Sequence, residues 1–541
     1  MIIKLTGGKV YDPINQIDGE IRDIYIQDGK IISPPTADRK YTEYDIKDAI
    51  VMPGAIDIHT HIGGGKVNIA RCMMNDAHGS SCDAGALDTH NTGLRYAEMG
   101  YTACFEPAML ACNARQAHLE MADTPCVDTG AYIMVGNTDM LLELMARGAD
   151  PKIIKDYVAW MINKTQAMAV KIVNPGGINA FKFNQRKLNI DEASAHYRIT
   201  PRQIIECLTQ TLAELNTPHP LHVHTSNLGV PGNYQTTLDT IKAANGYPMH
   251  ITHIQFHSYG TEGDHRFSSE GARIAEAINQ NPQLTADVGQ IMFGQTVTVS
   301  GDTMMQYANH GHASPAKWTV MDIECEAGCG VVPFKYQDKK FVNALQWVIG
   351  LEIFLLVNDP WRVFLTTDHP NGAPFTSYPH LIRLLMDYSY RIDMLSELHP
   401  QARKMSTLDT IKREYSLYEI AIMTRAAPSR SLGLNSKGHL SVGADADVVV
   451  YTPSQNIEHM FAQPRYVFKN GELMVRDGKV IKILPSYTHV IKPEYDPSIE
   501  KLIKKHYQEQ RTVGFENSQI SNDEMAECIG SPVVEHPCRT R

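Results

Sequence analysis

GAIDIHTHIGGG (residues 54–65) ends a short apolar stretch with two histidines and three glycines. Side chains at positions i and i+2 leave a strand on the same face, so His59 and His61 can reach one metal ion. The glycines leave room for a substrate beside them. By itself the HxH pattern is explained equally well by a pair of hydrogen-bonded core or surface histidines. The interpretation therefore depends on what the rest of the chain places beside this strand.

Outward from this stretch, roughly residues 51–435 alternate short apolar strands with polar helical segments. The predicted strands include YTACFEPAM (101–109), AMAVKIVNP (167–175), PLHVHTSN (220–227), PMHITHIQFH (248–257) and RVFLTTDHP (362–370), and the predicted helices include 201–215 and 271–281. This alternation predicts an α/β fold with a parallel (β/α)8 barrel, whose functional groups lie at the carboxyl ends of the strands. A doubly wound sheet is the rival architecture, but no GxGxxG opens a helix after the first strand.

The two ends of the chain share a sequence pattern that differs from that of the middle. Residues 5–32 and 438–481 both contain short alternating strands separated by glycine turns, including NG and DG pairs that favour hairpins. We therefore expect one small composite β-domain built from residues 1–50 and 436–490. The barrel would span 51–435, and 491–541 would form a polar, peripheral C-terminal extension.

The composition excludes several functional classes. The 541 residues include 50 Lys and Arg against 60 Asp and Glu, a formal net charge of −10, which argues against nucleic acid or an anionic membrane as a partner. The most apolar run, 344–357, is too short to span a membrane and contains Glu352, so it predicts a buried helix. The start of the chain lacks a signal-peptide pattern, and the ten cysteines contain no CxxC pair. A cytoplasmic protein without its own iron–sulfur cluster is expected.

Lys171 lies inside one of the predicted buried strands, AMAVKIVNP. Burial favours the neutral amine, because desolvation lowers the pKa of a lysine. A neutral amine can add CO₂ to become a carbamate, whose two oxygens can be shared by two divalent metal ions. A lysine paired with a carboxylate is the alternative interpretation.

Imidazole and carboxylate groups recur at the predicted strand ends. His222 and His224 lie in LHVHTSN, the next segment offers His250, His253 and His257, and Asp368 ends the apolar strand in FLTTDHPNG. Each residue alone has an ordinary structural explanation, such as a turn-forming Asp or a hydrogen-bonded core His. A barrel would bring them together.

This set resembles the amidohydrolase superfamily, with HxH on the first barrel strand, a carboxylated Lys on the fourth, His on the fifth and sixth, and Asp on the eighth. The resemblance implies that two divalent ions, most simply Zn²⁺, are held by His59, His61, carboxylated Lys171, His224, His253 and Asp368. His224 and His253 are chosen over their neighbouring histidines by matching VHT and ITH to the family's strands.

Four longer stretches, LRYAEMGYTACFEPA (94–108), GAYIMVGN (130–137), VKIVNPGG (170–177) and NLGVPGNYQTTLDT (227–240), are not required by a barrel. They resemble the A-type subunit of formylmethanofuran dehydrogenase, a family that includes the A-type subunit of the bacterial formyltransferase/hydrolase complex. Residues 76–93 depart from the archaeal pattern, which favours the bacterial complex. The resemblance implies a multi-subunit assembly with a formyltransferase subunit. It also implies a methanofuran-type coenzyme as substrate, in tetrahydromethanopterin-linked one-carbon metabolism.

The implied reaction is metal-dependent hydrolysis of N-formylmethanofuran to formate and methanofuran, or the reverse condensation. Asp368 would be the catalytic base, taking a proton from the attacking water and passing it to the leaving amine. Asn227 and His257 are predicted to contact the substrate, although a turn-forming Asn and a His that supports a metal ligand are equally open. The alternatives are formate condensation in a formylmethanofuran dehydrogenase, a cyclic amidase of the dihydroorotase or hydantoinase type, and a non-enzymatic scaffold subunit.

Overall fold

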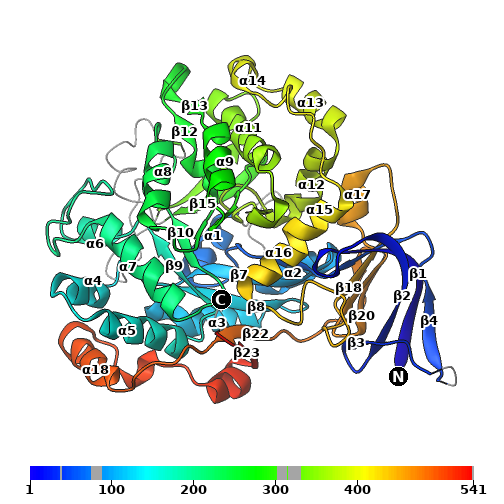
Figure 1. Ribbon diagram of the computed structural model, residues 1–541, viewed down its shortest axis with the longest axis horizontal. Helices are drawn as coiled ribbons and strands as arrows, with labels where there is room; N and C mark the ends of the chain where they lie inside the picture. The colour runs from blue at the N-terminus through cyan, green and yellow to red at the C-terminus, as the bar shows by residue number, and fades with distance from the viewer. Residues whose placement is uncertain (37–38, 75–87, 301–312, 315–329, 539–541) are drawn as a thin grey trace.

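A ring of eight parallel strands forms the centre of the molecule (Figure 1). The computed structural model describes residues 1–36, 39–74, 88–300, 313–314 and 330–538. Around the ring the strands are β6 (Ala55–Asp57), β7 (Tyr101–Met109), β8 (Asp128–Met134), β9 (Ala169–Val173), β10 (Leu221–His224), β11 (Met249–Ile251), β14 (Leu284–Asp287) and β17 (Val363–Phe364). Beyond the ends of β6 and β17, an isolated parallel bridge joins Thr60 to His369. The predicted (β/α)8 barrel is confirmed.

Helices connect successive strands and cover the outside of the ring. They are α2 (Thr89–Glu98), α3 (Ala114–Ala122), α4 (Asp139–Ala146), α5 (Pro151–Lys164), α6 (Gly177–Lys182), α7 (Pro201–Glu214), α8 (Tyr234–Ala243), α9 (Gly271–Gln280), α11 (Phe341–Leu356), α12 (Tyr378–Met386), α13 (Tyr388–Ser396), α14 (Pro400–Met405), α15 (Leu417–Ala421) and α16 (Ala427–Leu432). Helix α7 starts with a capping box, in which the side chains of Thr200 and Gln203 each accept from the backbone N–H of the other. Pro201 is the first residue of the helix, where its missing N–H costs no hydrogen bond. The helices predicted at 201–215 and 271–281 are α7 and α9.

Strands β8 and β9 are buried at every position, because helices cover one face and the barrel interior covers the other. Helix α11 is the buried helix expected around Glu352, whose carboxylate accepts hydrogen bonds from the Ser269 hydroxyl and from the Thr407 backbone N–H. These bonds offset the cost of burying a charged group inside an apolar helix.

Both ends of the chain form one second sheet, as the sequence predicts. Its N-terminal strands are β1 (Ile2–Asp12), β2 (Ile17–Gln27), β3 (Lys30–Ile32), β4 (Tyr41–Asp45) and β5 (Ile50–Pro53), and its C-terminal strands are β18 (Val448–Tyr451), β19 (Tyr466–Lys469), β20 (Glu472–Arg476) and β21 (Lys479–Val480). The two halves join where β5 and β18 pair antiparallel, with Val51 opposite Val450. Figure 1 shows β1, β2 and β4 beside β18 and β20 at the right of the molecule. Helix α17 (Ile457–Ala462) lies between β18 and β19 in the sequence and packs on α12.

The C-terminal extension is integrated into the barrel rather than merely appended to it. Strand β22 (Thr488–Ile491), at the boundary expected between the β-domain and the extension, continues the parallel sheet next to β8 rather than the second sheet, and β23 (Val533–His536) of the extension pairs with β22. Helix α18 (Ile499–Gln510) packs on α5, as Figure 1 shows at the lower left. This packing differs from the peripheral position expected for 491–541, because buried Ile499 and Ile503 give α18 an apolar face that the polar composition of the segment conceals.

A network of buried ion pairs joins the barrel to the second sheet. Asp128, at the start of β8, lies 2.8 Å from the Nζ of Lys437 and 2.7 Å from the Nζ of Lys469, and Lys437 also lies 2.8 Å from Asp447. All four side chains are buried. Burial acts to raise the pKa of Asp128, but the two lysines outweigh it and hold the pKa well below its usual range.

The substitution Asp128→Asn is expected to lower the free energy of unfolding by about 3–5 kcal/mol, because it leaves two lysines buried without their shared anion. The folded-state pKa of Asp128 is depressed, so its contribution is present near neutral pH and disappears as the pH falls through that pKa. Urea unfolding at pH 7 and at acidic pH measures both effects. Asp191→Asn, which removes an exposed partner of Arg202, is the matched control and should cost at most about 1 kcal/mol.

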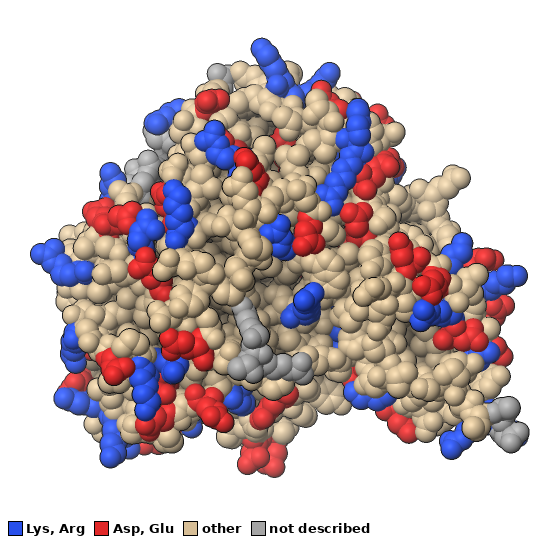
Figure 2. Space-filling model, viewed as in Figure 1, with Lys and Arg blue, Asp and Glu red and all other residues tan. Residues whose placement is uncertain are grey.

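On the face shown in Figure 2, Lys and Arg side chains are interspersed with Asp and Glu, without a large area of one sign. This agrees with the mixed, mildly acidic composition. Among the described residues, no helix has the length and apolar character needed to cross a membrane.

Candidate metal centre

The six residues predicted as metal ligands all lie in or just after barrel strands, on the carboxyl side of the ring. His59 and His61 follow β6, Lys171 lies within β9, His224 ends β10, His253 follows β11, and Asp368 follows β17. Because the carboxyl ends of parallel barrel strands converge, the six side chains gather at one end of the barrel.

The first group consists of His59, His61 and Asp368. Oδ1 of Asp368 lies 2.9 Å from Nε2 of His59 and 3.3 Å from Nε2 of His61. The two imidazole rings are nearly perpendicular, with centroids 5.5 Å apart. All three side chains are buried, and their ligand atoms lie close enough together to hold one metal ion.

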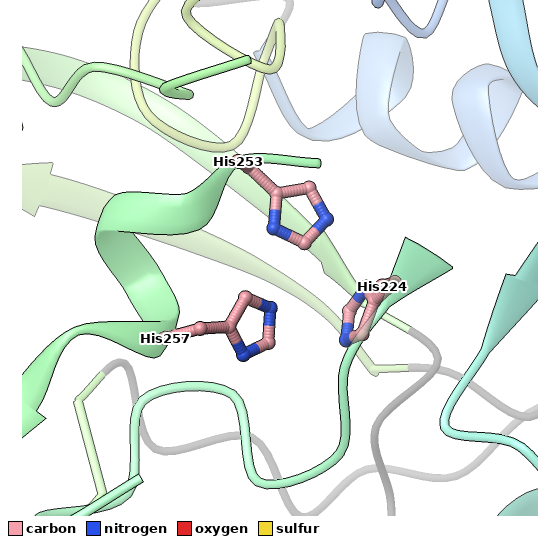
Figure 3. Close-up of side chains that lie close together, drawn as sticks. All are labelled: His224, His253 and His257. Carbon is pink, nitrogen blue, oxygen red and sulfur yellow. The ribbon is translucent and has the colours of Figure 1, made fainter. Parts of the chain in front are cut away.

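The second group consists of His224, His253 and His257. Figure 3 shows the three rings turned toward a shared space, from the end of β10, the second residue after β11 and the end of the short helix η3 (Ile254–His257). One nitrogen of each ring lies within 4.8 Å of the others. Nε2 of His224, Nδ1 of His253 and both nitrogens of His257 are buried without a hydrogen-bond partner among the described residues. Unpartnered buried nitrogens are costly, so this group fits a site that binds metal ions.

Lys171 lines the same cavity as members of both groups and is only 2% exposed. Burial lowers the pKa of its amine to about 8, and the attraction of Asp368, Asp287 and Glu106 only partly opposes that effect. Among the described residues, no carboxylate oxygen forms an ion pair with its Nζ. The alternative of a simple Lys–carboxylate pair therefore has no support in the described structure.

These residues border one cavity. His61, Lys171, His224, His253 and Asp368 line it, together with apolar side chains that include Leu110, Met134, Val173, Leu228 and Phe256. His59 lies beneath, in contact with Asp368. Neither Asn227 nor His257 is among the described residues that line the cavity; the amide of Asn227 donates to the Thr236 hydroxyl. Their predicted substrate contacts stay predictions.

Local backbone strain marks the same strand ends. His253 and Asp368 adopt positive φ angles of 35° and 52°, as do Asn174 (44°) and Asn227 (70°). In non-glycine residues this left-handed conformation raises the free energy of the folded state, and such strained residues are common at functional sites. Here it turns the side chains of His253 and Asp368 toward the cavity immediately after their strands end.

Two buried carboxylates that the sequence interpretation did not single out support the predicted ligands. Nδ1 of His61 donates to Glu106 at 2.9 Å, and Glu106 also accepts from the backbone N–H groups of Ile62 and Gly63. Asp287 accepts from the backbone N–H of His253 and lies 3.4 Å from Nδ1 of His59. Such partners fix the ring orientation of a metal-binding histidine. Asp287 ends β14, which is a signal that could have identified it, whereas Glu106 lies inside β7 and has no such signal.

The remaining histidines lie deeper in the barrel. His222 lies 2.9 Å from His59 and 3.0 Å from His219, while His250 contacts Asp287 at 3.0 Å. These rings support the floor of the site, whereas His224 and His253 line the cavity above them.

Sequence comparisons agree with this geometry. A model of the amidohydrolase family matches residues 42–480. The chain is 37% identical to the A-type subunit of the formyltransferase/hydrolase complex Fhc of Methylorubrum extorquens, with 98% of each chain covered. It is 40% identical to Protein FwdA of Methanocaldococcus jannaschii, with 88% of each chain covered.

Structure comparisons agree as well. The fold matches a chain in the crystal structure of FhcABCD from M. extorquens in complex with methylofuran, with a TM-score of 0.93, 37% identity and full coverage of both chains. A D-aminoacylase structure, at 13% identity and a TM-score of 0.50, shares the fold alone. The resemblance predicted from the sequence is confirmed, and the chain belongs to the amidohydrolase family.

Proposed function

We propose that this chain hydrolyses N-formylmethanofuran to formate and methanofuran, as the hydrolytic, A-type subunit of a formyltransferase/hydrolase complex. The observation that carries the proposal is the convergence of His59, His61, Lys171, His224, His253 and Asp368 at one end of the barrel. Full-length similarity to the Fhc relative, from an organism whose FhcABCD complex binds methylofuran, supports the choice of substrate and of partner subunits.

The site is proposed to hold two divalent ions, with Zn²⁺ matching the histidine and carboxylate ligands best. His59, His61 and Asp368 would hold one ion and His224 and His253 the other, with Lys171 carboxylated and shared between them. When bound, such ions polarise the formyl carbonyl and lower the pKa of a water molecule. The depressed pKa and buried position of Lys171 support its carboxylation, since only a neutral amine adds CO₂.

Asp368 is proposed as the catalytic base. Burial acts to raise its pKa, but His253 and His59 outweigh this effect and hold the pKa well below its usual range, so the group is a carboxylate. It would accept one proton as water adds to the formyl carbon. The C–N bond then breaks, and Asp368 returns the proton to the departing amine nitrogen, leaving formate. The same groups act in the opposite order when formate condenses with an amine.

The apolar cavity wall suits the organic part of the coenzyme next to the formamide, and it excludes water from the reacting carbon. Asn227 is proposed to act at the mouth of the site, because its loop follows His224 directly. His257, whose ring centroid lies 5.1 Å from that of His224 and 5.2 Å from that of His253, is proposed to hold the formyl group or to carry protons there.

Chelation is expected to abolish formate release from formylmethanofuran by the purified full-length chain, and added Zn²⁺ should restore it, because the donor set otherwise leaves buried nitrogens unpartnered. Formate is measured enzymatically, and bound metal by elemental analysis. If the metal-loaded chain releases no formate either alone or with its partner subunits, the proposal is wrong. Ring opening of dihydroorotate or a hydantoin instead would identify a cyclic amidase.

A second candidate is formate condensation in a formylmethanofuran dehydrogenase, which the 40% identity to FwdA favours. The similarity to the Fhc relative covers more of the chain, 98% against 88%, and favours the hydrolase. Reduction of CO₂ to formate by a co-purified partner subunit, which would supply the formate for this redox-neutral condensation, would support the second candidate.

A further inference from the structure

We infer that Asn371 is a positioning residue: its side-chain amide orients the Asp368 carboxylate and ties it to the hairpin formed by β15 (Gly294–Ser300) and β16 (Gly330–Tyr336). The inference rests on the proposed function, because it assigns Asn371 a part in the reaction for which Asp368 is the base. Asn371 itself lines the cavity and is 5% exposed.

The first arm of the amide holds the base. Nδ2 of Asn371 donates to Oδ1 of Asp368 at 3.0 Å, and the backbone N–H of Asn371 donates to the Asp368 carbonyl oxygen at 2.6 Å. His59 and His61 approach the same carboxylate oxygen, Oδ1. Three groups therefore converge on Oδ1, which restricts the orientation of the carboxylate.

The second arm holds the hairpin. The backbone N–H of Val299 in β15 donates to Oδ1 of Asn371, and the hydroxyl of Tyr336 in β16 donates to the Asn371 carbonyl oxygen at 3.0 Å. Because Val299 offers only a donor and Asp368 only an acceptor, the amide can be placed in one orientation alone. The side-chain nitrogen and oxygen of Asn371 and its backbone N–H and carbonyl oxygen therefore all have hydrogen-bond partners.

The hairpin is part of the cavity wall. Thr298, Val299 and Tyr336 line the cavity, and Val297 and Val331 pack on Ala70 of α1 (Gly65–Met74). The bonds through Asn371 therefore set the distance between this wall, where substrate lies, and the carboxylate that must take a proton. A misplacement of about 1 Å in such a pair can cost about 10²-fold in rate.

A purely structural asparagine, which only completes the turn after Asp368, would affect stability without a separate effect on turnover. The two roles are distinguished by separating kcat from KM. Asn371→Ala removes both side-chain bonds, to Asp368 and from Val299, but keeps the two backbone bonds of residue 371. Asn371→Asp keeps the side-chain volume and the acceptor for Val299, and Tyr336→Phe removes one hairpin bond while Asn371 stays intact.

In the metal-loaded full-length chain, Asn371→Ala and Asn371→Asp should each lower kcat by roughly 10- to 100-fold, with KM within about threefold of wild type. Tyr336→Phe should lower kcat by roughly 2- to 10-fold, the value of one hydrogen bond. Asn163→Ala is the matched control: it loses two amide bonds on α5, outside the cavity, and should keep the wild-type kcat.

The inference is overturned if both Asn371 variants keep kcat within threefold of wild type. It is also overturned if the losses in kcat of the two variants are in proportion to the decreases in their thermal unfolding midpoints. Should Asn371→Ala fail to fold, the volume-conserving Asn371→Asp decides alone.

A spectroscopic readout keeps this inference separate from the proposed function. The absorption bands of Co²⁺-loaded protein depend on the orientation of the ligands, and Asp368 is one of the proposed ligands. Asn371→Ala should shift these bands and Asn163→Ala should not; an unshifted spectrum contradicts the inference. If the wild type releases no formate while the shift is seen, the proposed reaction fails and the positioning role stands.

Discussion

Formate release from formylmethanofuran should fall by about 10³-fold or more in an Asp368→Asn variant. The amide has nearly the same shape as the carboxylate, but it cannot accept the proton that water loses on adding to the formyl carbon. The carboxylate is also the meeting point of His59 and His61, at 2.9 and 3.3 Å, so its charge stabilises any cation held there. Steady-state kinetics at saturating substrate measure the loss in kcat directly.

Metal content must be measured with the rate, since an amide can also weaken ion binding. If Asp368→Asn retains two metal equivalents and is nearly inactive, the loss belongs to proton transfer. If the variant loses one equivalent, reloading at high Zn²⁺ concentration separates the two effects. Asp156→Asn, a buried aspartate on α5 that accepts from the Asp496 backbone, is the matched control and should turn over at the wild-type rate. A fully active Asp368→Asn variant would exclude Asp368 as the base.

The sequence predicts the barrel and the position of the candidate site because both follow from local patterns. Apolar runs that end in His, Lys or Asp predict strands whose carboxyl ends carry functional groups, and the order of the runs along the chain is also their order around the ring. The pairing of β5 with β18 likewise follows from the shared hairpin chemistry of the two termini.

The depth at which each side chain lies inside the barrel does not follow from such patterns. His222 and His224 are two residues apart and leave β10 on the same face, so periodicity cannot distinguish them. In the structure His222 lies one layer lower, against His59, and only His224 lines the cavity. The choice between them depends on the register with neighbouring strands, in which His222 pairs with Lys171.

Contacts between distant segments are also hidden from the sequence. Glu106 is identified as a partner of His61 only once β7 lies beside β6, and Asn371 gains its role only once the hairpin brings Val299 to it. The C-terminal extension has a polar composition, yet its strand β23 joins the barrel sheet through β22. In each case the stabilising contact is made with a partner that is distant in the sequence, so the residues next to either partner do not predict it.

Lys171→Met should be the second most damaging substitution, lowering formate release by about 10³-fold or more and bound metal from two equivalents to at most one. Methionine fills a similar volume without nitrogen or oxygen, so the fold should persist while the proposed bridge is lost. The bound ions would stabilise the transition state by several kcal/mol, and each ~1.4 kcal/mol added to the activation free energy lowers the rate tenfold. Lys242→Met, on an exposed helix surface, is the control and should behave as wild type.

Whether Lys171 is carboxylated is tested by supplying bicarbonate, the source of the carbamate carbon. Burial lowers the pKa of this amine to about 8, so near that pH about half of it is neutral and reactive toward CO₂. Metal loading of the stripped protein should therefore require bicarbonate, and carbon-13 bicarbonate should introduce a carbamate NMR signal that Lys171→Met lacks. Lys171→Glu, whose shorter side chain brings its own carboxylate, should bind more metal than Lys171→Met and need no bicarbonate. Equal, bicarbonate-independent metal loading in wild type and Lys171→Met would show that the ions are held without this lysine, and a different bridging group would have to be sought among the groups that line the cavity.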